Sequence, residues 1–125
     1  MIKEKELVIK TIAMPSNANI DGNIFGGWVS SQMDLGGAIA AYTLIKSKIT
    51  TVAISSMKFI KPIFIGDVVC IYANLISIGR TSMNYEIETY ALRKETNLKE
   101  MVVKANFIYV KINKEGKPEN IGDIF

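Results

Sequence analysis

The sequence predicts a single α+β domain, spanning residues 1–125, in which one long helix packs across the concave face of a curved five-stranded antiparallel sheet. Residues 27–45 place apolar side chains at the three- and four-residue spacings of a helix. Extended segments lie before and after this stretch. The chain of 125 residues has the length of one domain, so the sheet is the place where so long a helix can be buried.

The extended segments are recognised by alternation of apolar and polar residues, which is clearest over residues 69–75 and 103–109. The predicted strands are residues 6–12, 50–60, 67–78, 81–93 and 99–111. Residues 78–82 and 95–97 have the composition of tight turns between strands. Pro62 cannot donate to a sheet ladder, so it marks a connection.

The predicted sheet has open edges, and such edges favour pairing with another chain. Hydrophobic residues make up 49% of the sequence, a high share for a small domain that indicates either a buried subunit interface or a large internal core. We therefore expect two copies to pair edge to edge. Small residues at positions 36–41 of the helix would let other backbone approach it closely.

Composition excludes several kinds of chemistry. The chain has no histidine, which rules out a Ser-His-Asp triad, a Cys-His pair and a zinc site with histidine ligands, and we predict no metal site. The one cysteine, Cys70, cannot form an intrachain disulfide and is interpreted as a buried core residue. The net charge of +3 is too small to indicate nucleic acid as the main partner, although a local basic patch for a phosphorylated ligand stays open.

Both ends of the chain are polar. Four of the first six residues are charged and no long apolar stretch follows them, so the N-terminus does not resemble a signal peptide. No run reaches the roughly 18 apolar residues of a membrane span, and a cytoplasmic location is expected by default. The tail after Asn113 is polar, with Gly116 and Pro118, as is typical of a loosely ordered segment.

Asp34 is an acidic residue near the middle of the apolar helix. Burying an ionised carboxylate costs several kcal/mol or more unless it is paired or neutralised. Asp34 lies about seven residues past the helix start, too far to cap it, and its helical neighbours Ser30, Gly37 and Ala41 are small. The position is therefore a candidate for catalysis, with a solvated helix face as the alternative.

A polar loop that contains glycine, residues 17–28, leads into this helix. The backbone N–H groups of Gly26 and Gly27 would lie at the helix N-terminus, where they could hold a carbonyl oxygen that gains negative charge. Asn19 could orient a water molecule or a carbonyl group. The alternative for all three residues is a turn.

Spacing along the helix limits how these groups can act together. Gly26 and Asp34 are eight residues apart, which is about 12 Å along a helix. One carbonyl group cannot contact both within one subunit. If both serve one reaction centre, the carboxylate must face the glycines of a neighbouring chain, so catalysis requires at least a dimer.

The loop and helix contain the pattern Asn-x-x-Gly-x-x-x-Gly-Gly-x-x-x-x-x-x-Asp, formed by Asn19, Gly22, Gly26, Gly27 and Asp34. With the later segments Met-Lys-Phe-Ile-Lys-Pro, residues 57–62, and Gly-Asp-Val-Val, residues 66–69, this pattern resembles the YciA-like acyl-CoA thioesterases of the hotdog fold. The likeness extends over roughly residues 10–112.

The resemblance implies hydrolysis of acyl-CoA to a free acid and coenzyme A, which is part of substrate and product rather than a separate cofactor. It assigns Asp34 as general base or nucleophile, Gly26 as the N–H donor to the thioester oxygen and Asn19 as a positioning residue. It also implies hotdog dimers assembled into hexamers, with sites at the dimer interface. Many hotdog enzymes carry histidine where this chain has Phe25.

The resemblance also suggests contacts to the rest of the substrate. The turn at residues 79–82 is similar to the family's nucleotide-contacting turn, so Arg80 could pair with a CoA phosphate or simply be solvated. Ser55, Ser56 and Lys58 lie on the strand expected beside the other subunit's helix, near the pantetheine arm or the carbonyl group. The substrate-binding candidates are Gly27, Ser55, Ser56, Lys58, Arg80, Thr81 and Ser82.

The resemblance thus implies an acyl-CoA thioesterase of broad specificity that forms hexamers, and the spacing of Gly26 and Asp34 adds that catalysis needs a homodimer. Two chemical routes stay open: Asp34 activates water, or it attacks first and the resulting anhydride is hydrolysed. A protein that binds or senses acyl-CoA without catalysis is the alternative. A hotdog hydratase or dehydratase is disfavoured because this chain has no histidine.

Overall fold

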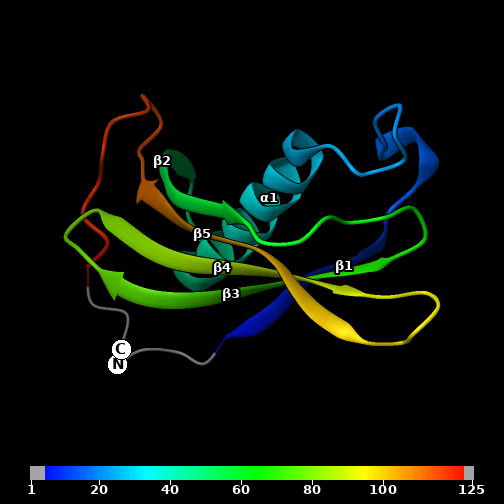
Figure 1. Cartoon of the computed structure of the whole chain (residues 1–125). Coiled ribbons are helices and arrows are strands. Elements are labelled where there is room, and N and C mark those ends of the chain that lie inside the picture. Colours follow the sequence, from blue (N-terminus) through cyan, green and yellow to red (C-terminus); the bar gives the residue numbers. More distant parts are fainter. Residues whose placement is uncertain (1–4, 123–125) are drawn as a thin grey trace.

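The computed structural model describes residues 5–122, and its elements follow the predicted order (Figure 1). They are β1 (Glu6–Ile12), a short 3-10 helix (Pro15–Asn17), α1 (Gly26–Ile45), β2 (Ile49–Phe59), β3 (Val68–Ile78), β4 (Ser82–Leu92) and β5 (Lys99–Lys111). The five strands form one antiparallel sheet that curves around α1, which is the hotdog fold. The α+β prediction is confirmed.

The order of strands in the sheet is β1-β3-β4-β5-β2, so the strands do not lie side by side in the order of the chain. β2 pairs with β5 at one edge rather than with β3, which follows it in sequence. The connection from β2 to β3 therefore runs from one edge of the sheet to the strand beside β1, which forms the other edge. At its start the Ile60 N–H donates to Val102 O at 2.7 Å, and at its end the Gly66 N–H donates to Ala13 O at 2.8 Å.

Small residues on α1 let the sheet come close to the helix axis. The buried positions of α1 are Val29, Met33, Gly36, Gly37, Ala40 and Ala41. A Cβ atom at Gly36 would lie 2.8 Å from Val8 Cγ2, and one at Gly37 would lie 2.1 Å from the Tyr109 hydroxyl oxygen. Both glycines are therefore required by the packing of the helix against the sheet. Cys70 is buried and unpaired in β3, as predicted.

β2 forms an exposed edge of the sheet with apolar side chains. Val52, Ile54 and Phe59 are each about half exposed, at 54%, 47% and 55%. The strand also departs from regular pairing, because its register with β5 shifts between Ser55 and Lys58. Such an edge is a ready surface for a second chain.

The segment after β5 folds back on the sheet. The Asn113 N–H donates to Lys117 O at 2.9 Å, and the Ile121 N–H donates to Arg80 O at 2.8 Å. The side chain of Ile121 is buried. These contacts tie residues 113–122 to the turn between β3 and β4, while the loose order expected from their composition stays a prediction.

Candidate functional site

Asp34 lies in the middle of α1, half-buried, where the helix faces β2 and β5. Thr51 Oγ1 donates a hydrogen bond to Asp34 Oδ1 at 2.7 Å. The Tyr109 hydroxyl lies 2.9 Å from the backbone oxygen of Asp34 and 3.2 Å from Oδ1. Among residues 5–122, no Lys or Arg forms an ion pair with Asp34, and no hydrogen bond reaches Oδ2. The carboxylate is held by two neutral donors through one of its two oxygens.

Tyr109 is held in its protonated form by its surroundings. Its side chain is fully buried, and burial raises the pKa of the phenol well above its usual range. The negative charge of Asp34 raises this pKa further. Tyr109 is therefore a hydrogen-bond donor to Asp34 at any ordinary pH. Gly37 provides the space that the hydroxyl occupies.

Gly26 is the first residue of α1, and its neighbourhood leaves the helix N-terminus open. Phe25, the N-cap, makes no side-chain hydrogen bond to the helix. The first backbone N–H groups of a helix have no partner within it, so those of Gly26 and Gly27 are available to a ligand. A cleft of ≈ 280 Å³ adjoins Gly26, and the ring of Phe59 forms part of its wall.

Asn19 takes part in the loop before the helix. Its Oδ1 accepts hydrogen bonds from the N–H groups of Asp21 at 2.9 Å and Asn23 at 3.2 Å. The structure thus contains the turn role that the sequence left open. Because these bonds use the oxygen, the side-chain Nδ2 remains as the group that could donate to a substrate.

One chain does not bring Gly26 and Asp34 together. α1 is continuous from Gly26 to Ile45, so the two residues are separated by about 12 Å along its axis. Gly26 lies beside Phe59 at the end of β2, whereas Asp34 bonds to Thr51 near the start of that strand. The two candidate groups therefore lie at opposite ends of the same edge strand.

The predicted substrate-binding residues fall into two groups, one exposed and the other exposed at Arg80 and half-buried at Thr81 and Ser82. Ser55, Ser56 and Lys58 are exposed on β2. Ser56 has a left-handed backbone with φ of 54°, which is unusual for a residue other than glycine and coincides with the irregular pairing of β2. Gly27 is also exposed, at the start of α1.

The second group, Arg80, Thr81 and Ser82, occupies the turn between β3 and β4. The turn is closed by a hydrogen bond from the Gly79 N–H to Ser82 O at 2.8 Å. Thr81 O accepts from the N–H of Lys111 at 2.9 Å, which places the turn beside the end of β5 and the start of β2. Arg80 is exposed there. In Figure 1 the turn between β3 and β4 lies at the end of the sheet away from the start of α1.

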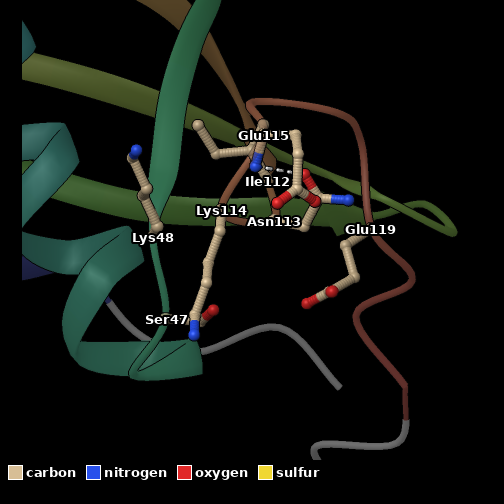
Figure 2. Close-up of a pocket in the computed structure, with 7 residues that line it drawn as sticks. All are labelled: Ser47, Lys48, Ile112, Asn113, Lys114, Glu115 and Glu119. Carbon is tan, nitrogen blue, oxygen red and sulfur yellow. Dashed lines mark hydrogen bonds between the residues drawn. The ribbon is translucent and has the colours of Figure 1, made fainter.

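A further cavity of ≈ 500 Å³ lies between the end of α1 and the segment after β5 (Figure 2). Its lining residues are Ser47, Lys48, Ile112, Asn113, Lys114, Glu115 and Glu119. None of the predicted site residues lines it. Its charged side chains are of both signs, which gives no preference for an anionic ligand.

Residues 5–122 contain no group of three or more Cys, Asp or Glu side chains placed to hold a metal ion. Within the same part of the chain, no helix is long and apolar enough to cross a membrane.

Thr51 and Tyr109 are the contacts of Asp34 that sequence reasoning missed. Tyr109 lies 75 residues from Asp34 along the chain. A signal was present, because Tyr109 ends a row of alternating residues in which the other members are apolar, and a buried tyrosine hydroxyl needs a partner. Thr51 carried no comparable signal.

Fold and site together define the class to which this chain belongs. Residues 21–96 match the model of the thioesterase superfamily, and the chain belongs to that family. The YciA resemblance is confirmed by curated relatives. The acyl-CoA thioester hydrolase YciA of Salmonella typhimurium is 41% identical over 116 residues, covering 90% of this chain and 87% of the relative. The Escherichia coli K12 protein of the same name is 39% identical over 120 residues, covering 94% and 91%.

Solved structures agree with these relatives. A hexameric thioesterase from Yersinia pestis has a TM-score of 0.90 and 42% identity, covering 94% of this chain and 96% of that one. A hexameric hotdog-fold thioesterase of Campylobacter jejuni has a TM-score of 0.85 and 38% identity, covering 94% and 90%. Fold and family are thus established over nearly the whole chain.

Proposed function

We propose that this protein hydrolyses acyl-CoA thioesters to free carboxylic acids and coenzyme A, with broad acyl specificity. The proposal is supported by relatives named as acyl-CoA thioester hydrolases at about 40% identity. The observation that carries it is Asp34, a carboxylate in an apolar helix that is held by neutral donors and leaves one oxygen free. A protein that only bound acyl-CoA would have no need of such a group.

The active site is composed of two subunits. β2 is an exposed edge strand with Asp34 beside its start and Gly26 beside its end. An antiparallel pairing of two β2 strands, centred near Ser55, sets the start of each strand opposite the end of the other. Asp34 of one subunit then faces Gly26 of the partner subunit, and the minimal active unit is a homodimer.

Further pairing of such dimers gives a hexamer, the assembly that the Yersinia and Campylobacter relatives form. The outer face of α1 offers apolar surface for assembly. Leu35, Ile39 and Tyr42 lie along it at helical spacing and are 52%, 42% and 59% exposed.

In the reaction, the thioester oxygen accepts a hydrogen bond from the Gly26 N–H at the open helix N-terminus, where the helix dipole favours developing negative charge. Asp34 Oδ2 takes a proton from water as the water attacks the carbonyl carbon, or Oδ2 itself attacks and water then hydrolyses the anhydride. The carbon–sulfur bond breaks, and coenzyme A leaves as a thiolate that is protonated. Asn19 Nδ2 assists in holding the carbonyl group or the water.

The coenzyme A portion extends along the exposed residues of β2 toward the turn between β3 and β4. Ser55, Ser56 and Lys58 contact the pantetheine arm, and Arg80, Thr81 and Ser82 contact the nucleotide. Arg80 pairs with a phosphate. Coenzyme A is part of substrate and product, so the reaction needs no other cofactor, and we place it in the cytoplasm.

The test is release of free thiol from short, medium and long acyl-CoAs. The wild-type protein should show turnover, and Asp34→Asn should lower kcat by about a thousandfold or more while binding of coenzyme A changes little. Retention of activity by Asp34→Asn would overturn the assigned role. Binding of acyl-CoA without any thiol release from the wild-type protein would instead establish a binding protein.

A further inference from the structure

We infer that Tyr109 and Thr51 are positioning residues that select which oxygen of Asp34 reacts, and that Gly37 exists to admit the Tyr109 hydroxyl. This inference rests on the proposed function, because it concerns the same carboxylate. It goes beyond that function by assigning different roles to the two oxygens of Asp34: Oδ1 is the anchor and Oδ2 is the reacting atom.

The hydrogen bonds around Asp34 fix one of its two carboxylate oxygens. Thr51 Oγ1 at 2.7 Å and the Tyr109 hydroxyl at 3.2 Å both converge on Oδ1. The Tyr109 hydroxyl also lies 2.9 Å from the backbone oxygen of Asp34, so it ties the side chain to its own main chain. Rotation of the carboxylate would break these contacts. Oδ2, for which no partner is found among residues 5–122, is thereby kept in a fixed direction.

The groups that donate to Asp34 are neutral hydroxyls rather than cations. A lysine or arginine at this place would stabilise the carboxylate charge so strongly that Asp34 would be a poor base or nucleophile. Hydroxyl groups fix its direction with a smaller penalty. Tyr109 comes from β5 and Thr51 from β2, so α1, the edge strand and its neighbour in the sheet all meet at one carboxylate.

Gly37 leaves the space that the Tyr109 hydroxyl occupies. It lies almost one turn after Asp34 on α1, and a Cβ atom there would stand 2.1 Å from the Tyr109 hydroxyl oxygen and 2.7 Å from Cζ. Phenol rings are rigid and this one is fully buried, so it has little room to move aside. Any side chain at position 37 would displace the hydroxyl from Asp34.

The decisive variant is Tyr109→Phe, which keeps the ring and removes only the donor. We expect kcat to fall by about 10- to 100-fold, the usual effect of losing one hydrogen bond to a charged group, with KM within about threefold of wild type. Thr51→Val should act in the same direction, and Thr51→Ser, which keeps the hydroxyl, should restore most of the activity.

The pH dependence of kcat/KM distinguishes a loss of positioning from a general loss of structure. Removing a hydrogen-bond donor from a carboxylate disfavours its ionised form, so the acidic limb of kcat/KM should move to higher pH in Tyr109→Phe. The titratable groups that face this region are Tyr109 from β5 and, against its ring, Tyr85 from β4, on which Glu6 of β1 acts.

Tyr85→Phe is the matched control. Its ring centroid lies 6.1 Å from that of Tyr109, it is equally buried in the core, and it makes no hydrogen bond to Asp34. It should leave kcat and the acidic limb unchanged. If Tyr109→Phe matches wild type in both kcat and pH profile while Asp34→Asn is inactive, the positioning role is wrong and the proposed function stands. If Asp34→Asn retains activity, the proposed function itself fails.

Discussion

Two aspartates of this chain have contrasting surroundings. Asp67 is 3% exposed and lies 2.6 Å from Arg93 Nη1 through Oδ2, which also accepts the Phe64 N–H at 2.9 Å. Asp34 is half-buried, and within the described part of the chain its carboxylate accepts hydrogen bonds only from the hydroxyls of Thr51 and Tyr109. One carboxylate is neutralised by a cation, and the other is only oriented.

Under the proposed function, this difference separates a structural carboxylate from a reactive one. Arg93 also donates to the backbone oxygen of Pro62 at 3.0 Å and to Glu100 at 3.1 Å, so its pair with Asp67 fastens the connection between β2 and β3 to the end of the sheet. A charge fixed in this way holds the chain together and is unavailable for chemistry. Within residues 5–122 no Lys or Arg forms an ion pair with Asp34, so in the proposed reaction its carboxylate is available to the substrate.

The same substitution at the two sites should therefore have opposite consequences. Asp67→Asn breaks a buried pair and leaves the Arg93 guanidinium with Glu100 as its carboxylate partner. The free energy of unfolding should therefore fall by about 2 kcal/mol. The kcat of the folded protein should stay within about threefold of wild type. Asp34→Asn should abolish turnover and change the free energy of unfolding by less than about 1 kcal/mol. Urea unfolding measures the loss of stability in both variants, and thiol release measures their kcat. Equal losses of stability in the two variants would contradict this prediction.

The close contact between Gly37 and the Tyr109 hydroxyl provides the next test. Gly37→Ala should lower the free energy of unfolding by about 1–3 kcal/mol, because its methyl group would overlap the Tyr109 hydroxyl. In a Tyr109→Phe background the nearest atom is gone, and the cost should be smaller. Urea unfolding of the two single variants, the double variant and the wild type measures the coupling between the sites. Additive effects would mean that the hydroxyl is not what Gly37 accommodates.

The hydroxyl of Thr89 can be compared with the hydroxyls of Thr51 and Tyr109, which contact Asp34. Thr89 is fully buried in β4, and its Oγ1 has no hydrogen-bond partner among residues 5–122. Thr89→Val keeps the shape and removes an unsatisfied polar group, so the free energy of unfolding should rise by about 1 kcal/mol. Thr51→Val, in which the lost hydroxyl had a carboxylate partner, is the matched comparison. A loss of stability in Thr89→Val would show that its hydroxyl is satisfied in solution.

Local patterns in the sequence were enough to predict α1 and the five strands, and they also single out Asp34 as a candidate site residue. Alternating residues in β3 and β5 and the small apolar residues of α1 are properties of short windows. An acidic residue in such a helix stands out in the same way. The turn residues around Arg80 and Asn97 were found for this reason as well, and Asn97 has the positive φ of 62° that such turns require.

What the sequence could not predict depends on contacts between distant segments. That β2 lies beside β5 rather than β3 follows from the packing of the whole sheet. The contact between Tyr109 and Asp34 joins residues 75 positions apart, and the need for Gly37 appears only once that contact is known. Asn19 shows the limit in another form, because both its turn role and its proposed contact with substrate use the same side chain.

The central claim is that each active site takes Asp34 from one subunit and the Gly26 N–H from the partner subunit. Gly26→Pro removes this N–H at the first position of a helix, where proline is well tolerated, and Phe25 already has the extended backbone that precedes proline. Gly26→Ala adds a similar Cβ atom beside Phe59 but keeps the N–H, so it is the matched control. Gly26→Pro and Asp34→Asn should each be nearly inactive when pure.

The most direct measurement is the activity of mixed assemblies formed by expressing Asp34→Asn and Gly26→Pro together with different affinity tags. If sites are shared, a dimer that contains one copy of each variant has one intact site, so an equal mixture should regain about a quarter of the wild-type kcat. If the mixed assemblies form but their activity does not exceed the sum of the two pure variants, the site does not span two subunits and the account is contradicted.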